Sequence, residues 1–414
     1  MYLTRIEERM LKGEEGIVVQ KCMELLVKYG DAVNAKRLLK VDNAACVPPL
    51  DNREFLALGA DKEEFLDTKV RTVTAALQGP LTAEGCKDMG VKDESKFNLY
   101  EKRQEVCQRM GIYCLNTCVP YLIGYVPVRN QIVAWTESST TGVVNGVFGA
   151  RTNLEGTSSF CAAITGRMPE FGFYLDENRV GTHLIKVDAK LRDYVDFDLL
   201  GYFVGKRVML DVPVFVGMPQ PDIDKLKSFS ASSSSSGGVQ MYHIVGVTPE
   251  APTVKVAFGG DRPREKITVG WDDLEESYDY LNSTSEENID YAVLGCPHSS
   301  MTQIRETASL LAGKKVKVPL WIATAPLTKD WAEVMGYAAT LAKSGAKLIE
   351  SGCPVSQRIE GGEVMATNSC KMAHYAPGFF GLDTPNYGVR FGKTEDVIDA
   401  AISGKWKGKW RPGE

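Results

Sequence analysis

Three cysteines far apart in the sequence share one local pattern, a cysteine beside a proline in a polar turn. The pattern occurs as TCVP at Cys118, GCPH at Cys296 and GCPV at Cys353. Distant cysteines that converge on one pocket suit an iron–sulfur cluster with one iron left open to a substrate oxygen. Taken alone, the pattern also allows structural thiols or a nucleophilic cysteine. The chain has ten cysteines and no CxxC pair, which argues against a zinc ribbon or a ferredoxin-type cluster.

A second feature is a run of small polar residues at 117–156, which begins beside Cys118. Buried side-chain oxygens and amides need hydrogen-bond partners, so such a run is poor core material and favours a ligand-binding cradle. A solvated turn region rich in Ser, Thr and Gly is the alternative interpretation. The polar residues of this cradle are Glu137, Ser138, Ser139, Thr140, Asn145, Arg151, Thr152 and Asn153.

Two more candidate groups lie in the C-terminal third of the chain. His298 follows Cys296 by two residues in an expected loop, which favours a role in the same site over a packed core histidine. Ser369 and Lys371 lie among small residues, where a lysine is rarely placed unless it meets an anion. His243 has apolar neighbours and is predicted to be a core residue.

Composition indicates a globular protein long enough for two or three domains. The chain has 414 residues, 44% of them hydrophobic and 24% charged, and a formal net charge of -5. This charge argues against nucleic-acid binding, and the basic run at 405–411 is predicted to be a solvated tail. Because no signal peptide and no run of about 18 apolar residues is found, we expect a cytoplasmic protein without a membrane span.

The last third of the chain alternates strands with helices. This order predicts a parallel sheet with right-handed crossovers, in which ligands bind at the carboxyl ends of the strands. Cys296 and Cys353 fall at two such ends. The expected strands are 289–294, 316–323 and 347–350, and the expected helices are 301–311 and 331–344.

Earlier segments give less regular patterns. Residues 3–29 are expected to form one helix, and residues 199–216 either two strands or a helix and a strand. The serine-rich run at 228–239 has the composition of a flexible linker, although its small residues equally allow close approach to another backbone.

Six motifs occur in order along the chain, and they are TCVPY, AWTESSTTGVVNGVFGARTN, AAITGRMPEFG, HIVGVTPEA, LGCPHSS and TNSCKMAHYAPG. Together they resemble the large subunit of the aconitase X family, and the resemblance covers nearly the whole chain. It implies an α/β fold of aconitase-like three-layer α/β/α domains with parallel sheets, and it makes 228–239 part of a folded domain. We expect a helical segment at 1–40, a region at 41–285 carrying Cys118 and the cradle, and a βαβ-type region at 286–414.

The resemblance implies an iron–sulfur hydro-lyase with Cys118, Cys296 and Cys353 as cluster ligands. It implies a substrate-facing motif made of Glu137, Ser138, Arg151, Thr152 and Asn153, and a C-terminal motif with Ser369 and Lys371. Ser139 and His298 join these candidates by position, and Glu137, His298, Ser369 and Lys371 are the catalytic candidates. Arg151 and Lys371 would hold anionic substrate groups. The base is either a serine of a partner subunit or Ser369.

The expected substrate is mevalonate 5-phosphate. The alternatives are cis-3-hydroxy-L-proline or another small hydroxy acid, and a non-catalytic iron–sulfur protein. The resemblance also implies a small swivelling-domain subunit, which this chain is too short to contain, and therefore a heterodimer. Residues 43–50 and 71–80 depart from the family pattern, because Cys46 and Gln78 lie where the family has a histidine motif and Asn-Pro. We expect these segments to bear on the choice of substrate.

Overall fold

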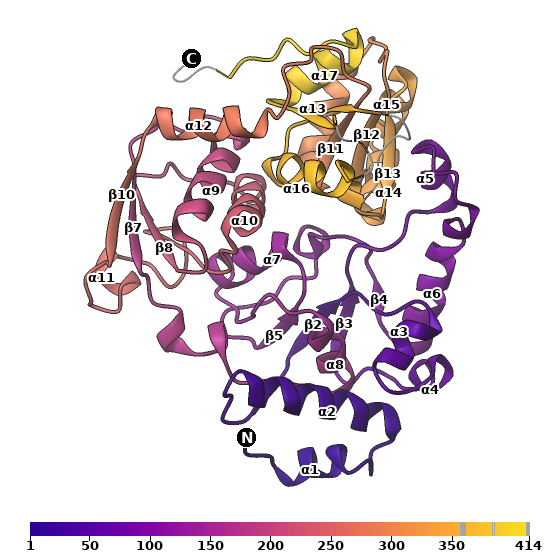
Figure 1. Ribbon diagram of the computed structural model, residues 1–414, viewed down its shortest axis with the longest axis vertical. Coiled ribbons are helices and arrows are strands. Elements are labelled where there is room, and N and C mark those ends of the chain that lie inside the picture. Colours follow the sequence, from indigo (N-terminus) through magenta and orange to yellow (C-terminus); the bar gives the residue numbers. More distant parts are fainter. Residues whose placement is uncertain (357–361, 383, 385, 411–414) are drawn as a thin grey trace.

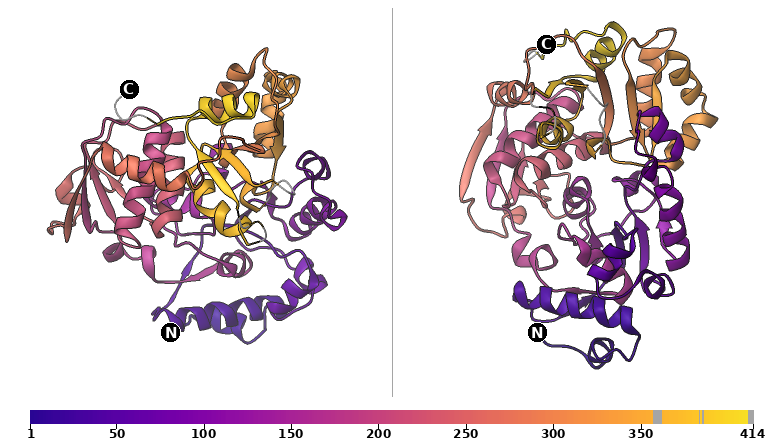
Figure 2. Two further views of the ribbon diagram at one scale, coloured as in Figure 1. Left: turned by 45° about the horizontal axis from the view of Figure 1, so that its top comes forward. Right: turned by 45° about the vertical axis from the view of Figure 1, so that its right-hand side comes forward.

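The chain folds around three parallel sheets in the computed structural model, which describes residues 1–356, 362–382, 384 and 386–410. Figure 1 shows the first sheet in the lower centre above α2, the second sheet at the left and the third at the upper right. Two further views in Figure 2 keep these three groups distinct. In the described part of the chain, no helix has the length and apolar character needed to cross a membrane.

The first sheet has the strand order β4-β3-β2-β5, all parallel. Alternate residues of a strand point to opposite faces, so Ala44 packs with α2 and α8 while Ala45 packs with the segment after β5. The strands are β2 Asn43–Cys46, β3 Val73–Ala76, β4 Tyr113–Cys114 and β5 Val133–Trp135, and β1 Leu38–Lys40 pairs antiparallel with β6 Arg167–Pro169. The helices are α1 Arg5–Leu11, α2 Ile17–Ala32, α3 Asn52–Ala57, α4 Lys62–Leu66, α5 Ala83–Asp88, α6 Leu99–Met110, α7 Ser138–Gly142 and α8 Thr157–Thr165.

The single helix expected at 3–29 is wrong, because the structure has α1 and α2 there. Gly13 and Gly16 adopt φ of 82° and 102° between them. Glycine reaches this left-handed region without steric penalty, so the chain turns here instead of continuing the helix.

The second sheet has the order β10-β7-β8-β9, also parallel. The helix-and-strand alternative for 199–216 is confirmed by α9 and β8. The serine-rich run is no linker, because most of it lies in α10, which packs on α9. A Cβ placed on Gly205 of α9 would lie 2.5 Å from the Ser233 carbonyl oxygen, so the predicted close approach of small residues is confirmed. The elements are β7 His183–Val187, α9 Tyr194–Val208, β8 Pro213–Val216, α10 Ile223–Gly237, β9 His243–Ile244, α11 Val254–Ala257, β10 Glu265–Val269 and α12 Trp271–Leu281.

The third sheet has the order β13-β12-β11-β14-β15, and the predicted parallel crossovers are confirmed. One face packs with α13, α15 and α17 and the other with α16, which gives the expected α/β/α layers. Gly336, with φ of 77°, divides the helix expected at 331–344. The elements are β11 Tyr291–Ser299, α13 Met301–Leu311, β12 Leu320–Thr324, α14 Pro326–Val334, α15 Tyr337–Ser344, β13 Lys347–Glu350, β14 Val364–Thr367, α16 Cys370–Phe380, β15 Gly388–Phe391 and α17 Thr394–Ser403.

The basic run at 405–411 is not a solvated tail over its described residues. Trp406 and Trp410 are only 4% and 6% exposed, and the Trp410 indole donates a 3.0 Å hydrogen bond to Asp196. Arg411 lies outside the described residues. Trp410 therefore belongs to the core beside α9, and Trp406 belongs to the core of the third sheet.

Candidate active site

Cys118, Cys296 and Cys353 come together at one cavity between the first and third sheets. Cys118 follows β4, Cys296 lies near the carboxyl end of β11, and Cys353 follows β13. The carboxyl ends of β11 and β13 lie at the same edge of the third sheet, on either side of β12, because all three strands are parallel. The cavity is lined by Gln78, Cys118, Glu137, Gly295, Cys296, Pro297, His298, Gly352, Cys353, Pro354 and Lys371.

The cavity favours neutral thiols when no cation is bound to them. Burial raises the pKa of Cys118 to about 12, with Glu137 adding to the effect and Lys371 opposing it. Burial likewise raises the pKa of Cys296 well above its ordinary value. The backbone N–H of His298 lies 3.4 Å from the Cys118 sulfur and would stabilise a thiolate there. A bound metal group would supply the positive charge that thiolate ligands require.

In the described part of the chain, the three cysteines share one cavity without forming a site for a single metal ion. Within residues 1–356, 362–382, 384 and 386–410, no three Cys, His, Asp or Glu side chains could hold a single metal ion. The three thiols nevertheless face one cavity and are close enough for their charges to interact. This donor set, with three sulfurs around one space, is compatible with a multinuclear cluster.

A buried ion pair forms the wall opposite these thiols. The Lys371 ammonium lies 2.6 Å from Glu137 Oε1 and 2.8 Å from the Ser138 hydroxyl. Burial alone would raise the pKa of Glu137, but the charge and hydrogen bond of Lys371 outweigh it, so this pKa lies below its ordinary value. Burial would lower the pKa of Lys371, but Glu137 and the nearby thiols raise it above its ordinary value. Both side chains are therefore charged at neutral pH.

Glu137 is held in place by local and distant groups. Its carboxylate caps α7 by accepting a 3.2 Å hydrogen bond from the Ser139 backbone N–H. The Ser139 hydroxyl donates to Glu137 and lies 3.1 Å from the Cys118 carbonyl oxygen. The Gln78 amide donates to Glu137 Oε2, while Gln78 Oε1 is buried and has no protein partner. Gln78 thus presents a free acceptor at the cavity, and it lies in one of the two segments that the sequence expected to bear on the choice of substrate.

His298 joins the loops that carry the cysteines. Its Nδ1 lies 3.1 Å from the Thr117 hydroxyl and its Nε2 lies 2.9 Å from the Gly352 carbonyl oxygen. Burial lowers the pKa of His298 to about 4, so the ring is neutral at pH 7. Nε2–H must then donate to Gly352, and Nδ1 accepts from Thr117. This geometry makes His298 a positioning residue, while its predicted catalytic role stays a prediction.

Lys227 is a buried residue near the site that the sequence did not single out. Its ammonium lies 3.0 Å from the His298 carbonyl oxygen, 2.5 Å from Gln303 Oε1 and 3.1 Å from Asp224. It thereby anchors the backbone that follows Cys296. Its position directly before the serine-rich run, which has the composition of a linker, concealed this role.

Ser369 lies on the far side of Cys296, in a neighbouring polar cavity. Its hydroxyl caps α16 by accepting a 3.1 Å hydrogen bond from the Met372 N–H. Asp198 lines the same cavity, accepts from the Cys370 N–H at 2.8 Å, and has a pKa raised to about 7 by burial. Ser369 is absent from the lining of the thiol cavity.

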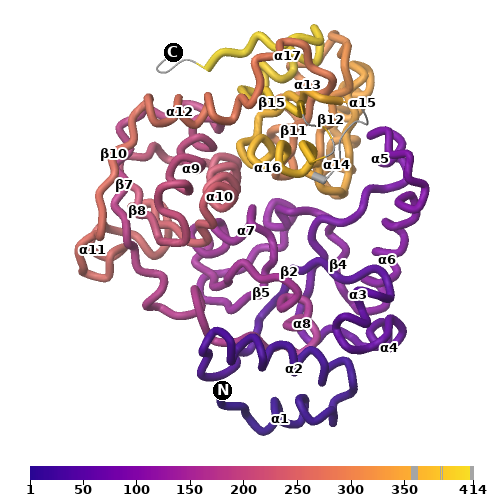
Figure 3. The backbone as a smooth tube through the Cα atoms, in the orientation of Figure 1, coloured from indigo at the N-terminus to yellow at the C-terminus, as the bar shows by residue number. Residues whose placement is uncertain are grey.

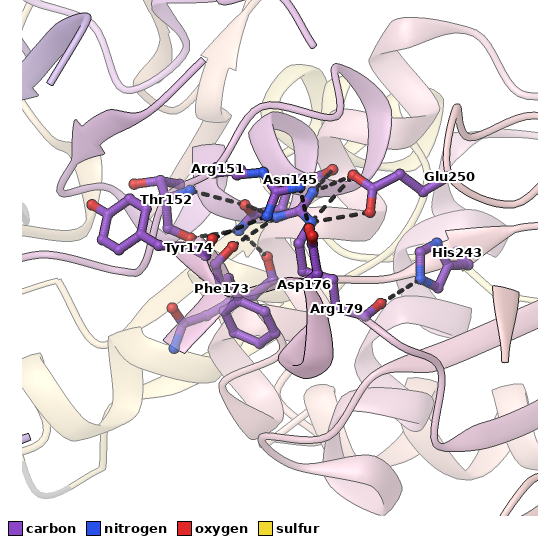
Figure 4. Close-up of polar contacts among 10 residues, drawn as sticks. Asn145, Arg151, Thr152, Phe173, Tyr174, Asp176, Arg179, His243 and Glu250 are labelled. Atoms are coloured by element: carbon purple, nitrogen blue, oxygen red, sulfur yellow. Dashed lines mark hydrogen bonds and ion pairs between the residues drawn. The ribbon is translucent and has the colours of Figure 1, made fainter. Parts of the chain in front are cut away.

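The polar cradle divides into two parts. Glu137 and Ser138 contact Lys371 at the thiol cavity, whereas 151–153 belong to a separate polar cluster (Figure 4). Arg151 there binds the Tyr174 carbonyl oxygen at 3.0 Å and pairs with Asp176. The structure does not bring 151–153 to the cavity lining, so their assignment to substrate stays a prediction.

Thr152 and Asn153 support local structure in that separate cluster. The Thr152 backbone N–H donates to Asn145 Oδ1 at 3.0 Å, and Asn153 Oδ1 accepts from the Phe173 N–H at 2.8 Å.

His243, predicted to be a core residue, is 2% exposed and its Nε2 lies 2.7 Å from the Arg179 carbonyl oxygen. The burial of His243 is confirmed.

Fold and site together define the class of this protein. The sequence matches the aconitase X first domain over residues 1–177, the second domain over 181–279 and the third domain over 289–403. The chain belongs to the aconitase X family, and it is an enzyme of the hydro-lyase (dehydratase) class.

Individual relatives are similar over nearly the whole chain. A phosphomevalonate dehydratase large subunit from Methanocaldococcus jannaschii is 35% identical over 412 residues, covering 96% of this chain and 99% of that protein. A cis-3-hydroxy-L-proline dehydratase from Pseudomonas aeruginosa is 32% identical, covering 97% of this chain and 70% of that protein. The crystal structure of Thermococcus kodakaraensis aconitase X in its holo-form superposes with a TM-score of 0.82 and 34% identity, covering 97% of this chain and 100% of that one. The fold class is confirmed.

Proposed function

We propose that this chain is the large subunit of a phosphomevalonate dehydratase, which removes water from mevalonate 5-phosphate. The observation that carries the proposal is the end-to-end match to proteins named as that large subunit. The matched cis-3-hydroxy-L-proline dehydratases extend well beyond the aligned region, with only 70% and 69% of their lengths covered. A separate small subunit, a swivelling domain, would complete the enzyme as a heterodimer.

The proposed cofactor is an iron–sulfur cluster held by Cys118, Cys296 and Cys353. When bound, the cluster would supply a Lewis acid that accepts the departing hydroxyl group of the substrate. The fit rests on three sulfurs at one cavity and on the backbone N–H of His298 beside Cys118.

Lys371, Glu137 and Gln78 would bind and orient the substrate. Lys371 offers an ammonium held by Glu137 at the cavity wall, suited to a carboxylate or phosphate oxygen. The unpartnered Gln78 oxygen would accept a hydrogen bond from a substrate hydroxyl. A dehydratase also needs a base for the carbon-bound proton, and Ser369 lies in the neighbouring cavity. This placement favours a serine of the small subunit as the base.

The cofactor proposal predicts that Cys296→Ser abolishes cluster binding. Anaerobically purified chain should contain iron and absorb visible light, and Cys296→Ser should lose most of both because one thiolate ligand is missing. Iron analysis and an absorption spectrum test this without measuring activity. Cys86→Ser is the matched control, since Cys86 is buried outside the cavity and should keep the full spectrum. An unchanged spectrum in Cys296→Ser would show that the ligand assignment is wrong.

The substrate proposal requires both subunits. We expect the anaerobically copurified complex to convert mevalonate 5-phosphate to its dehydrated product and to leave cis-3-hydroxy-L-proline unchanged. Product formation can be followed by mass spectrometry, with the large subunit alone as the control. Turnover of hydroxyproline but not of the phosphate ester would favour the alternative dehydratase.

A further inference from the structure

A second thiol cluster lies on the opposite face of the first sheet from Cys118. Cys46 of β2 lies beside Ala76 of β3, which in turn lies beside Cys114 of β4. Residues paired in this way across a sheet point to the same face, so the three side chains share one face. Helix α6 covers this face with Arg103 and Cys107 on its buried side. Figure 3 shows α6 beside the β4 edge of the sheet.

Arg103 is the unusual member of this cluster. Its side chain is 2% exposed, and its Nε and Nη1 have no hydrogen-bond partner in the described structure. A buried guanidinium with free donors is costly unless an anion lies nearby. Burial lowers the pKa of Arg103, while Cys107, Cys114, Cys46 and Glu54 oppose that effect, in this order.

A thiolate is the best available counter-ion for Arg103. Glu54 is exposed, and it is engaged in capping α3, where Oε2 accepts from the Leu50 N–H at 2.6 Å and from the Asp51 N–H at 3.2 Å. Burial raises the pKa of Cys46 to about 12. Cys114 is only partly buried, so it can be reached from solvent.

Local hydrogen bonds also favour the thiolate of Cys114. The Cys107 thiol lowers the pKa of Cys114 to about 7 against the opposing effect of burial, and Arg103 and Asn116 also lower it. Asn116 Oδ1 lies 3.5 Å from the Cys114 sulfur, and Asn116 Nδ2 is buried without a partner. Because amide oxygen and nitrogen are interchangeable in such an assignment, a rotated Asn116 would donate an N–H to the thiolate.

We propose that Cys114 is a peroxide-reactive thiolate and that Cys107 is its resolving partner, so that hydrogen peroxide converts the pair into a reversible disulfide. The Cys114 sulfur attacks one peroxide oxygen, the O–O bond breaks, and the leaving hydroxide takes a proton to form water. Sulfur is oxidised by two electrons to a sulfenic acid and the peroxide is reduced. The Cys107 sulfur then displaces hydroxide from Cys114, and this hydroxide leaves as water with the Cys107 proton. A dithiol reductant reverses the step.

A second thiol pair in the same chain provides an internal control. Cys22 and Cys161 also share a hydrogen bond, which with burial raises the pKa of Cys22. Both are buried, so neither is open to solvent as Cys114 is. This modification site is independent of the proposed dehydratase function.

The test uses the full-length chain, a brief exposure to hydrogen peroxide, and alkylation of the remaining thiols. We expect mass spectrometry to find a disulfide between tryptic peptides 104–109 and 110–129. Chymotryptic cleavage after Leu115 then separates Cys114 from Cys118. Iodoacetamide should modify Cys114 at least about tenfold faster than Cys22 before oxidation. Any of three results would overturn the proposal. They are the absence of a disulfide between peptides 104–109 and 110–129, a disulfide formed by Cys118 instead, and equal alkylation rates of Cys114 and Cys22.

Two variants separate the roles of the cluster residues. Cys107→Ser should leave Cys114 as a sulfenic acid that dimedone traps, with no disulfide. Arg103→Gln should slow the alkylation of Cys114 about tenfold, because the counter-ion is lost. Persistent disulfide in Cys107→Ser overturns the assignment of the resolving thiol, and this variant remains informative if Arg103→Gln does not fold.

Discussion

At the scale of single residues, the ion pair between Glu137 and Lys371 organises the thiol cavity. Its members are separated by 234 residues in sequence, and their charged atoms lie 2.6 Å apart. Each charge depends on the other, because removing one partner of a buried pair leaves an uncompensated charge, at a cost of about 3–5 kcal/mol. The pair therefore contributes to the stability of the junction between the first and third sheets.

We predict that Glu137→Gln destabilises the fold at pH 7 and lowers kcat/KM of the complete enzyme at least about 100-fold. The pKa of Glu137 is below its ordinary value in the folded chain. Its stabilising effect is thus complete above the unfolded carboxyl pKa of about 4.3 and is lost as the pH falls through the lower folded value. Denaturation midpoints should differ most between wild type and Glu137→Gln at pH 7, and the difference should shrink at low pH.

An exposed pair provides the control for this prediction. Lys186 and Asp188 lie 2.9 Å apart, but their side chains are 62% and 49% exposed. Lys186→Met should change stability by less than about 1 kcal/mol at any pH. A pH-independent difference between wild type and Glu137→Gln would contradict the charged state assigned to the carboxylate.

At the scale of elements, α9 and α10 pack so closely that their contact needs small residues. A Cβ on Gly237 would lie 1.7 Å from the Gly205 carbonyl oxygen, and a Cβ on Gly201 would lie 2.4 Å from the Phe229 carbonyl oxygen. Both obstacles are backbone atoms, which cannot move aside as a flexible side chain can. The close packing keeps Lys227 of α10 in reach of the backbone after Cys296.

Gly237→Ala should therefore destabilise the chain by about 1–3 kcal/mol through overpacking. Gly378→Ala is the matched control, because Gly378 lies in α16 and a Cβ there meets nothing within 4 Å. That substitution should stabilise by about 0.5–1 kcal/mol, since alanine favours helix over glycine. Thermal unfolding of both variants measures the contrast, and a neutral Gly237→Ala would refute close helix packing here.

At the scale of the whole molecule, Arg179 connects the first two family domains (Figure 4). It is 3% exposed and lies between the matched ranges 1–177 and 181–279. Its guanidinium binds Asn145 Oδ1 at 3.0 Å and the Phe173 carbonyl oxygen at 3.1 Å in the first domain. In the second domain it donates hydrogen bonds to both carboxylate oxygens of Glu250, at 2.5 Å and 3.0 Å.

We expect Arg179→Met to destabilise the protein by about 3–5 kcal/mol, because the Glu250 carboxylate and several buried acceptors lose their partner. Arg37→Met is the control, since Arg37 is 61% exposed and solvent screens its pair with Glu170, 2.7 Å apart, so that its loss should change stability little. Urea denaturation of the two variants provides the comparison. Equal losses would mean that Arg179 does not tie the domains together.

The sequence by itself determined the parallel βαβ order of the third sheet, because strand and helix periodicities and the Gly and Pro positions are local signals. The same signals placed Cys296 and Cys353 at the carboxyl ends of two strands of this sheet. Motif resemblance then indicated the family, which the matched domains confirm. The helix ends at Gly336 and at Gly13 and Gly16 could not be predicted in the same way. Whether a glycine ends a helix depends on its backbone angle, and tertiary packing selects that angle.

Only the tertiary structure decided which polar residues meet. Glu137 and Arg151 belong to one polar run, yet Glu137 faces the thiols while Arg151 pairs with Asp176. A serine-rich run with linker composition became helix α10 because its small side chains let it pack against the backbone of α9. Burial, long-range pairing and close backbone approach join residues that are distant in sequence, and no local pattern contains that information.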